Sequence, residues 1–255
     1  MIIKKEFPIL EFDDNRDAII CPYKEAKRDN KRFPNKLIIT FFKDVIKRLL
    51  QAELIEVYDI LSGENDLIVY KFKESDILLI HGMIGGPATG GFLDELIGCG
   101  VTNIMFCGGG GVINKDITVG KFIVVDGSIR DEGFSYHYVK PSRIIKSNQR
   151  VKEKICNYLD SRNINYLIGL TWTTDAFFRE TEDKIKLRKD EGALVVEMEQ
   201  AGLIAVSEFR NVDYGAIIYG GDDVSGSEWD KRGWHSRSDV RYALVFACKD
   251  ILEID

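Results

Sequence analysis

Val195-Val196-Glu197-Met198-Glu199 is the stretch that decides the fold, because it joins a short apolar strand to two carboxylates. A helical stretch follows it, and the next apolar run, Ala216-Ile217-Ile218-Tyr219, leads to a second acidic pair, Asp222-Asp223. Apolar runs of this length are typical of strands that are buried on both faces of a sheet. Acidic residues placed after two such strands predict a polar site at the edge of a sheet.

The rest of the chain repeats this alternation of short apolar runs and amphipathic stretches. Further strands are expected at 18–20, 54–61, 67–72, 77–80, 103–107, 121–128, 166–171 and 214–220. Helices are expected at 40–50, 88–98, 148–161, 179–190, 200–208 and 237–254. Strands that alternate with helices predict an α/β fold, in which helices flank a central mixed, mostly parallel β-sheet. No low-complexity linker interrupts the pattern, so we expect one domain over residues 1–255.

Composition argues against several classes of protein. Hydrophobic residues make up 45% of the 255 residues, which is enough for a core that needs no disulfides. The formal net charge of -6 argues against a nucleic-acid partner, because such proteins usually carry a basic face. We find no signal peptide, and no apolar run reaches the length of a membrane span. We therefore expect a cytoplasmic protein with no membrane partner.

The cysteines give no sign of a metal site or a disulfide framework. The chain has five cysteines and three histidines, and no two cysteines form a C-x-x-C pair. An odd number of cysteines without paired spacing is unlike a zinc site or a set of structural disulfides. Most of these cysteines adjoin apolar runs, where a thiol behaves as a small buried hydrophobe. We expect no bound metal.

Two glycine clusters follow predicted strands. The segment 81–87, His-Gly-Met-Ile-Gly-Gly-Pro, lies between a strand and a helix and predicts either a tight turn or an anion-binding helix start. It matches neither a Walker loop nor the G-x-G-x-x-G fingerprint. The second cluster is Gly108 to Gly111, at a predicted strand end. Glycine there permits close approach either of a ligand or of another strand.

Taken in order, these motifs resemble the nucleoside phosphorylase superfamily, of the uridine and purine nucleoside phosphorylase type. The matching segments are 82–87, 108–112, 119–125 (VGKFIVV), 130–133 (RDEG), 173–180 (TTDAFFRE), 195–203 (VVEMEQAGL) and 222–223. The resemblance covers about residues 75 to 225. It implies the nucleoside phosphorylase-like α/β fold and a small-molecule nucleoside as substrate. It also implies a homo-oligomer and no cofactor, with inorganic phosphate as a possible co-substrate.

The resemblance assigns roles to the sugar-binding residues. Glu199 would hold the ribose hydroxyls through a bidentate, charge-assisted contact. Met198 would pack on the sugar, and Glu197 would be either a second polar contact or a structural partner. From the residues alone, the two glutamates alternate along a strand and face one side, which two separate salt bridges would also satisfy.

Other residues would contact the base. Phe177 lies where the family stacks an aromatic ring on the nucleobase, although Phe177 and Phe178 would also suit a core. Asp222 lies where purine-cleaving members keep the aspartate that protonates the base, although it would also suit a turn cap. An arginine commonly assists such an acid, and Arg232 and Arg237 are the candidates, with His235 between them.

The phosphate-binding residues depart from the family pattern. We align the family's N-terminal glycine and arginine loop with residues 20–25, where Cys21 replaces the glycine and Glu25 falls near the arginine. At the later strand end, Met105 replaces an arginine and Gly108 a hydroxyl residue. A carboxylate in place of an arginine repels phosphate. The amides of Gly108, Gly109 and Gly110 would still suit a small anion nest.

Three functions follow from this pattern. The family default is phosphorolysis of a nucleoside to the free base and ribose 1-phosphate, with purine slightly favoured because Asp222 is present. The first alternative is a hydrolase in which Glu25 positions water. The second alternative is a protein that binds nucleosides without cleaving them. The catalytic candidates are therefore Asp222, Glu25 and Arg237.

Overall fold

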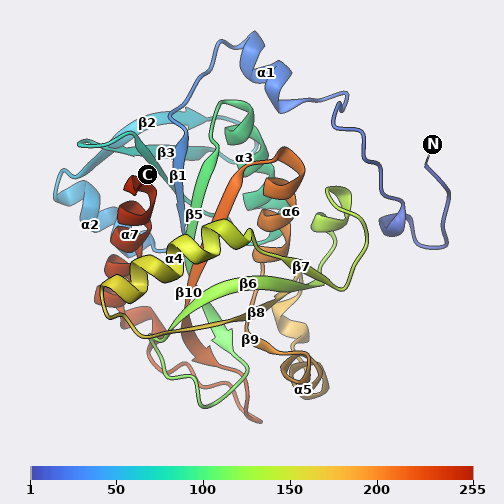
Figure 1. Cartoon of the computed structure of the whole chain (residues 1–255), viewed down its shortest axis with the longest axis vertical. Coiled ribbons are helices and arrows are strands. Elements are labelled where there is room, and N and C mark those ends of the chain that lie inside the picture. The colour runs from blue at the N-terminus through green and yellow to red at the C-terminus, as the bar shows by residue number, and fades with distance from the viewer. Residues whose placement is uncertain (1, 255) are drawn as a thin grey trace.

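The computed structural model describes residues 2–254 and is a single α/β domain (Figure 1). Its strands are β1 (Lys36–Thr40), β2 (Ile55–Leu61), β3 (Leu67–Phe72), β4 (Ile77–His81), β5 (Asn103–Val112), β6 (Phe122–Asp131), β7 (Ile144–Lys146), β8 (Tyr166–Thr174), β9 (Ala193–Glu197) and β10 (Asp213–Asp223). Its α-helices are α1 (Pro22–Arg28), α2 (Lys43–Gln51), α3 (Gly86–Gly98), α4 (Gln149–Ser161), α5 (Glu182–Asp190), α6 (Gln200–Arg210) and α7 (Ser238–Glu253). Short 3-10 turns are η1 (Pro8–Leu10), η2 (Phe134–His137), η3 (Phe177–Arg179) and η4 (Trp234–Ser236).

The ten strands form one mixed sheet in the order β10-β6-β8-β9-β5-β1-β4-β3-β2, with β7 beside β6. Because β10 also pairs with β5, the strands β5, β9, β8, β6 and β10 close into a ring. The strands β1, β4, β3 and β2 extend from β5 as an open sheet. The predicted mixed sheet with flanking helices is confirmed. The parallel pairs β1–β4, β1–β5, β10–β5, β6–β8 and β8–β9 contain most of the paired residues. The antiparallel pairs include the meander of β2, β3 and β4 and the short pairing of β5 with β9.

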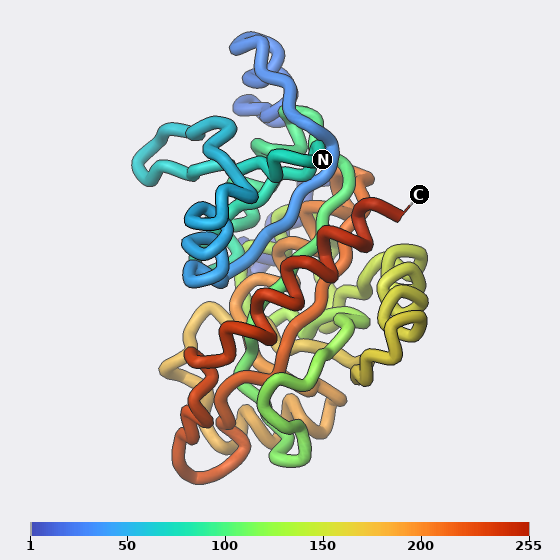
Figure 2. The backbone as a smooth tube through the Cα atoms, turned by 90° about the vertical axis from the view of Figure 1, so that its left-hand side faces the viewer, coloured from blue at the N-terminus to red at the C-terminus, as the bar shows by residue number. Residues whose placement is uncertain are grey.

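Helices cover the sheet on both faces. On one face, α3 and α6 pack their apolar sides over a core that includes Leu93, Leu203 and Phe106. On the other face, α2, α4 and α7 cover a second core that includes Leu49 and Leu244. Figure 2 shows α7 crossing this second face between α2 and α4. None of the helices within residues 2–254 is both long and apolar enough to cross a membrane.

The predicted strand at 18–20 is wrong. Ile19 and Ile20 are fully exposed, and this part of the chain has no strand to pair with. A strand needs a hydrogen-bonded neighbour, and three apolar residues in an extended linker do not supply one. The first strand is instead β1, which pairs with both β4 and β5 in the middle of the open sheet. The expected strands do not include it, and the helix expected at 40–50 overlaps its last residue, Thr40.

The predicted strand at 103–107 is too short, because β5 continues through the four glycines to Val112. A Cβ on Gly108 would come within 2.8 Å of the Phe106 ring. A Cβ on Gly109 would come within 3.1 Å of the Tyr219 ring, and one on Gly110 within 3.0 Å of the Val196 carbonyl. Close packing within the chain therefore already favours glycine at these positions, whether or not a ligand approaches them.

Candidate functional site

The sheet opens along the glycines of β5. On one edge of β5, β1 ends at Thr40, which pairs with Cys107. The antiparallel strand β9 pairs with β5 only at Gly111 and Val112. The edge of β5 between Cys107 and Gly111 thus lies where the neighbouring strand changes and its direction reverses. Such switch points are where α/β sheets bind ligands.

Glu199 is the residue that precedes α6, two positions after the end of β9, which pairs with β5, and it is not part of a strand. Its buried carboxylate accepts a 2.7 Å hydrogen bond from the backbone N–H of Gly85, at the start of α3. Burial, followed by the charge of Glu197, raises the pKa of Glu199 to about 8. A buried carboxyl with one backbone donor retains acceptor capacity for a ligand's hydroxyl groups.

Glu197, the last residue of β9, is held entirely by its own chain. It accepts hydrogen bonds from the backbone N–H of Glu199 at 2.6 Å and from that of Gln200 at 2.7 Å. The Thr173 hydroxyl donates to its other oxygen. Burial raises the pKa of Glu197. These contacts cap the start of α6, and they support the structural-partner interpretation of Glu197.

Asp222 lies at the Gly111 end of the opening. Both of its carboxylate oxygens would be 3.7 Å from a Cβ on Gly111, and one accepts a 2.6 Å hydrogen bond from the Trp229 indole Nε1. Three residues of strand separate Gly108 from Gly111, which corresponds to about 10 Å. The glycine run therefore extends over the length of a small ligand, with Asp222 beside its Gly111 end.

Glu180 is a third carboxyl group near Asp222, and it is not among the residues predicted to form the site. It directly follows η3 and is half-buried. Burial and the charge of Asp222 raise the pKa of Glu180 to about 7. Within residues 2–254 its side chain has no hydrogen-bond donor. Its place at the end of the TTDAFFRE motif was the one sequence signal that pointed to it.

Aromatic rings are exposed near this end. Phe177 is 50% exposed and Phe178 is 87% exposed, with their ring centroids 4.2 Å apart. The alternative in which these two rings belong to the core is therefore wrong. Trp229 is also exposed, and Met198 is half-buried. Exposed rings of this kind suit contact with a flat ligand.

The two candidate arginines differ in their surroundings. Arg232 donates to the carbonyl oxygens of Gly221 at 2.7 Å and Ile117 at 2.8 Å, and it lies 3.9 Å from the Asp223 carboxylate. Arg237 is exposed, and its side chain has no hydrogen bond or ion pair within the described chain. Neither guanidinium contacts the Asp222 carboxylate. The structure thus does not bring Arg237 together with Asp222, because its helix start faces solvent.

Glu25 does not join the other candidates. It lies on α1, where it is exposed and pairs with Arg28 at 2.5 Å. The α1 backbone at Pro22 packs against Gly98, just before β5 begins. Figure 1 shows α1 at the top of the molecule, whereas β5 and β10 run toward the bottom. Residues 20–25, which the sequence aligned with a phosphate loop, therefore do not lie at the opening of β5.

The segment that does lie at the opening follows β1, contains Phe41 and Phe42, and leads to Lys43 at the start of α2. Phe41 packs over Gly82, whose N–H donates to the Thr40 carbonyl. Met105 is buried in the middle of β5 and packs near Gly215, so it is also absent from the strand end. The sequence missed this loop because the strand that precedes it was not recognised.

His81, at the end of β4, is the titratable group beside this loop. Its ring centroid lies 6.1 Å from that of Phe41. Burial, aided by the positive charge of Lys43, lowers the pKa of His81. The imidazole is therefore neutral at pH 7 and can accept a proton.

A buried arginine behind the glycines was also missed. Arg241, in α7, donates to Asp44 at 2.9 Å and to the Tyr219 hydroxyl at 3.1 Å. The Tyr219 hydroxyl in turn donates to the Trp234 carbonyl at 3.0 Å. These contacts connect α7 to α2 and to the strand β10 behind the opening. Spacing along an amphipathic helix gave no signal that this arginine, rather than Arg237, is buried.

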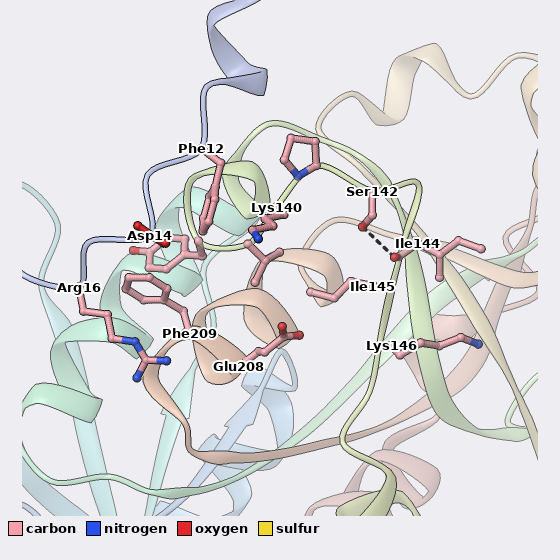
Figure 3. Close-up of a pocket in the computed structure, with 13 residues that line it drawn as sticks. Phe12, Asp14, Arg16, Lys140, Ser142, Ile144, Ile145, Lys146, Glu208 and Phe209 are labelled. Atoms are coloured by element: carbon pink, nitrogen blue, oxygen red, sulfur yellow. Dashed lines mark hydrogen bonds between the residues drawn. The ribbon is translucent and has the colours of Figure 1, made fainter. Parts of the chain in front are cut away.

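A cavity of about 510 Å³ lies elsewhere, beneath the N-terminal segment (Figure 3). Phe12, Tyr138 and Phe209 line it together with the charged residues Lys140 and Glu208. Arg210 holds the segment above it by donating to the Arg16 carbonyl and to Asp94. None of the candidate site residues lines this cavity. Across residues 2–254, no three His, Cys, Asp or Glu side chains gather closely enough to hold a metal ion.

Comparison with known proteins identifies a family. The family model described as "Phosphorylase superfamily" matches residues 36–240, which begin at β1. The chain is 24% identical to a guanosine phosphorylase of Halorubrum lacusprofundi over 166 residues, which are 65% of this chain and 69% of that protein. It is 30% identical to a uridine phosphorylase of Thermococcus kodakarensis over 108 residues, 42% of this chain and 39% of that protein.

Solved structures share the fold. A uridine phosphorylase of Vibrio fischeri ES114 superposes with a TM-score of 0.68 at 22% identity, covering 88% of this chain and 92% of that one. An AMP nucleosidase of Bacteroides thetaiotaomicron superposes with a TM-score of 0.70 at 19% identity, covering 87% and 88%. At these identities the likeness concerns the fold alone.

Proposed function

Because this chain belongs to the phosphorylase superfamily of nucleoside phosphorylases and nucleosidases, we propose that it cleaves the N-glycosidic bond of a purine nucleoside. The observation that carries the proposal is a buried carboxyl group and a solvent-accessible one near the glycine run of β5. Glu199 is fixed by the Gly85 amide, and Asp222 lies beside Gly111. The run from Gly108 to Gly111 extends about 10 Å along the strand, a length that suits a nucleoside with its sugar toward Glu199 and its base toward Asp222.

Glu199 binds the sugar in this proposal. Its carboxyl group is fixed by the Gly85 amide and keeps free acceptor sites for the 2′ and 3′ hydroxyls. Hydrogen bonds from two hydroxyls favour its ionised form, and a buried anion near C1′ then stabilises a positively charged sugar in the transition state. Met198 packs on the apolar face of the sugar.

The base lies at the Asp222 end. Phe177 and Phe178 expose ring faces there, and a purine stacks well on such rings. Asp222 and Glu180 are the two groups that can supply a proton to a ring nitrogen. A neutral base leaves more easily than an anion, so proton transfer lowers the barrier to cleavage.

Water is the nucleophile that the charges favour. Phosphate needs unpaired cations, whereas Arg232 and Arg241 already donate to groups of their own chain. Lys43 is the one cation that acts on His81 in the described chain. The neutral imidazole of His81 suits the acceptance of a proton from an attacking water molecule.

Phosphorolysis is the second candidate. The phosphorylase names of the sequence relatives favour it. In this chain, Lys43 and the amides of Gly108, Gly109 and Gly110 would have to hold the phosphate. The observed arginine contacts would then have to change when phosphate binds.

A substrate panel tests the proposal. Purified protein is incubated with guanosine, adenosine, inosine, uridine and AMP, with and without phosphate, and both products are identified. We expect base release from purine nucleosides and free ribose as the sugar product. Ribose 1-phosphate formed only with phosphate would establish phosphorolysis instead. A rise in melting temperature with no base released would indicate a binding protein.

A pair of variants, one in the site and one outside it, tests whether any measured activity comes from this site. Glu199→Ala is expected to lower base release at least 100-fold, because the sugar contact is lost. Glu74→Ala is the control, since Glu74 is exposed in the turn between β3 and β4. Equal activity of the two variants would contradict the proposed role of Glu199.

We also propose that the protein forms a homo-oligomer. Sedimentation velocity measures its oligomeric state directly.

A further inference from the structure

The segment RDEGFS, residues 130–135, spans the end of β6 and the start of η2, and the proposed function assigns it no role. Arg130 is buried, and it donates to the Ser135 hydroxyl at 2.8 Å and to two backbone carbonyls of the loop that follows. The backbone N–H of Ser135 donates to the Glu132 carboxylate at 2.9 Å. Because these bonds lie on both sides of Phe134 in the chain, they fix the backbone that carries its ring.

The Phe134 ring lies in a cradle of three glycines, two from α3 and one from α6. A Cβ on Gly90 would come within 2.3 Å of the ring, and one on Gly202 within 2.9 Å. A Cβ on Gly86 would come within 3.4 Å of the Phe134 Cβ. Contacts this close leave no room for a methyl group on Gly90 or Gly202, so the space between the two helices is matched to the ring.

The cradle adjoins both partners of the hydrogen bond that fixes Glu199. Gly86 directly follows Gly85, whose N–H donates to the Glu199 carboxylate at 2.7 Å. Gly202 lies in the first turn of α6, three residues after Glu199. A Cβ on Gly202 would come within 3.3 Å of the Gly86 Cα, so the two helices also touch each other beside the ring. Phe134 therefore packs against the starts of both helices that this hydrogen bond connects.

We propose that Phe134 is a positioning residue for Glu199, and that its ring sets the separation of the two helix starts. This inference rests on the proposed function. The Gly85 amide occupies one acceptor position of the carboxyl group, so the remaining positions must be aimed at the 2′ and 3′ hydroxyls together. Through Glu199, Phe134 thus determines the preference for ribose over 2′-deoxyribose.

The preference for ribose is the first test. It is measured as the ratio of kcat/KM for the best purine nucleoside to that for its 2′-deoxy form. Phe134→Ala should lower this ratio by about 10-fold or more, because a displaced carboxyl group contacts one hydroxyl instead of two. A loss of folded protein lowers both rates equally and leaves the ratio unchanged. An unchanged ratio in a folded Phe134→Ala would overturn the proposal.

Phe209→Ala is the matched control. Phe209 is also in α6, about two turns beyond Gly202, and its ring contacts Tyr138 with centroids 5.6 Å apart. Its removal takes away aromatic packing of the same helix without touching the cradle, so the ratio should stay within about twofold of the wild type. An equal fall in both variants would show that the ratio responds to any loosening of α6, which would contradict a specific role for Phe134.

Hydrogen exchange gives a readout without turnover. The bond to Glu199 protects the Gly85 amide in the free protein, and NMR follows its exchange with solvent. Phe134→Ala should speed exchange at Gly85 by about 10-fold or more relative to Phe209→Ala, while the amides of β1 stay protected. Phe134→Leu, which keeps part of the ring's volume, should give a smaller change in the same direction and replaces the alanine variant if that variant does not fold.

The exchange experiment also separates this inference from the proposed function. Equal exchange at Gly85 in the wild type and the Phe134 variants would overturn the inference even in an active enzyme. Faster exchange at Gly85 in variants of a protein that releases no base would support the packing role and reject the proposed function alone.

Discussion

The backbone N–H of Gly85 donates a 2.7 Å hydrogen bond to the carboxylate of Glu199, which lies 114 residues further along the chain. Gly85 precedes α3 with φ at 96°, a conformation that favours glycine. The bond connects the end of the β4 segment to the start of α6. It favours the ionised carboxylate, yet the pKa of Glu199 is still raised to about 8. Burial and the charge of Glu197 therefore outweigh the backbone hydrogen bonds that favour the ionised form.

The raised pKa of Glu199 predicts a pH dependence of stability. The ordinary value is 4.5 and the folded value about 8, so the folded state binds the proton more tightly. The contribution is complete below about pH 4.5 and is lost as the pH rises to about 8. Glu199→Gln removes this titration, so its stability relative to the wild type should grow by up to about 1.4 kcal/mol per pH unit. Urea unfolding at pH 5, 6, 7 and 8 measures it, and parallel curves would contradict it.

Glu197 is predicted to matter for stability more than for ligand contact. Glu197→Ala leaves two backbone N–H groups and the Thr173 hydroxyl without their acceptor. The free energy of unfolding should fall by about 2 kcal/mol or more. Glu197→Gln is the matched control, because its amide oxygen can still accept from the backbone, and its loss should be smaller. Chemical denaturation compares them, and equal losses would argue against the capping role.

Glu25→Gln is predicted to leave base release unchanged within about twofold. The carboxylate is exposed on α1 and pairs with Arg28 near the amino end of β5, away from Glu199 and Asp222. Surface changes of this kind also cost little stability. Steady-state kinetics with the best purine nucleoside check it. A loss of 100-fold with normal folding would restore Glu25 as a candidate for positioning water.

Arg241 and Arg237 form a matched pair for a stability experiment. Arg241→Met removes one partner of a largely buried contact with Asp44 and the Tyr219 hydroxyl, so it should cost about 3–5 kcal/mol. Arg237→Met, one helical turn earlier, removes an exposed side chain and should change stability by less than about 0.5 kcal/mol. Thermal and urea unfolding distinguish the two. A comparable loss of unfolding free energy in both variants would contradict the prediction that the exposed Arg237 side chain contributes little to stability.

The fold was predictable wherever apolar periodicity and burial coincide. The segments 77–80 and 88–98 predicted β4 and α3 because a buried strand and its covering helix both carry strong local patterns. The error at 18–20 shows the limit. Whether three apolar residues form a strand depends on a neighbour elsewhere in the chain, which sequence periodicity does not reveal. That error displaced the expected phosphate loop from the end of β1 to α1.

The same limit applies to the candidate site, which was predictable only in part. Glu199 and Asp222 follow buried strands, so their ends of the sheet could be inferred from the sequence. Glu180 and Trp229 lie on connecting segments, and their proximity to Asp222 depends on the path of those segments. The role of Glu197 depends on which backbone amides it meets. No spacing rule predicts such contacts.

The register of β5 against β1, β9 and β10 fixes the length of the opening along β5. Backbone hydrogen bonds to these neighbouring strands set that length, which is a fixed number of residues. Changing one side chain cannot lengthen it. Attempts to redirect this protein to larger or smaller molecules should therefore leave Gly108 to Gly111 untouched. The exposed rings of Phe177, Phe178 and Trp229 are the residues to vary instead.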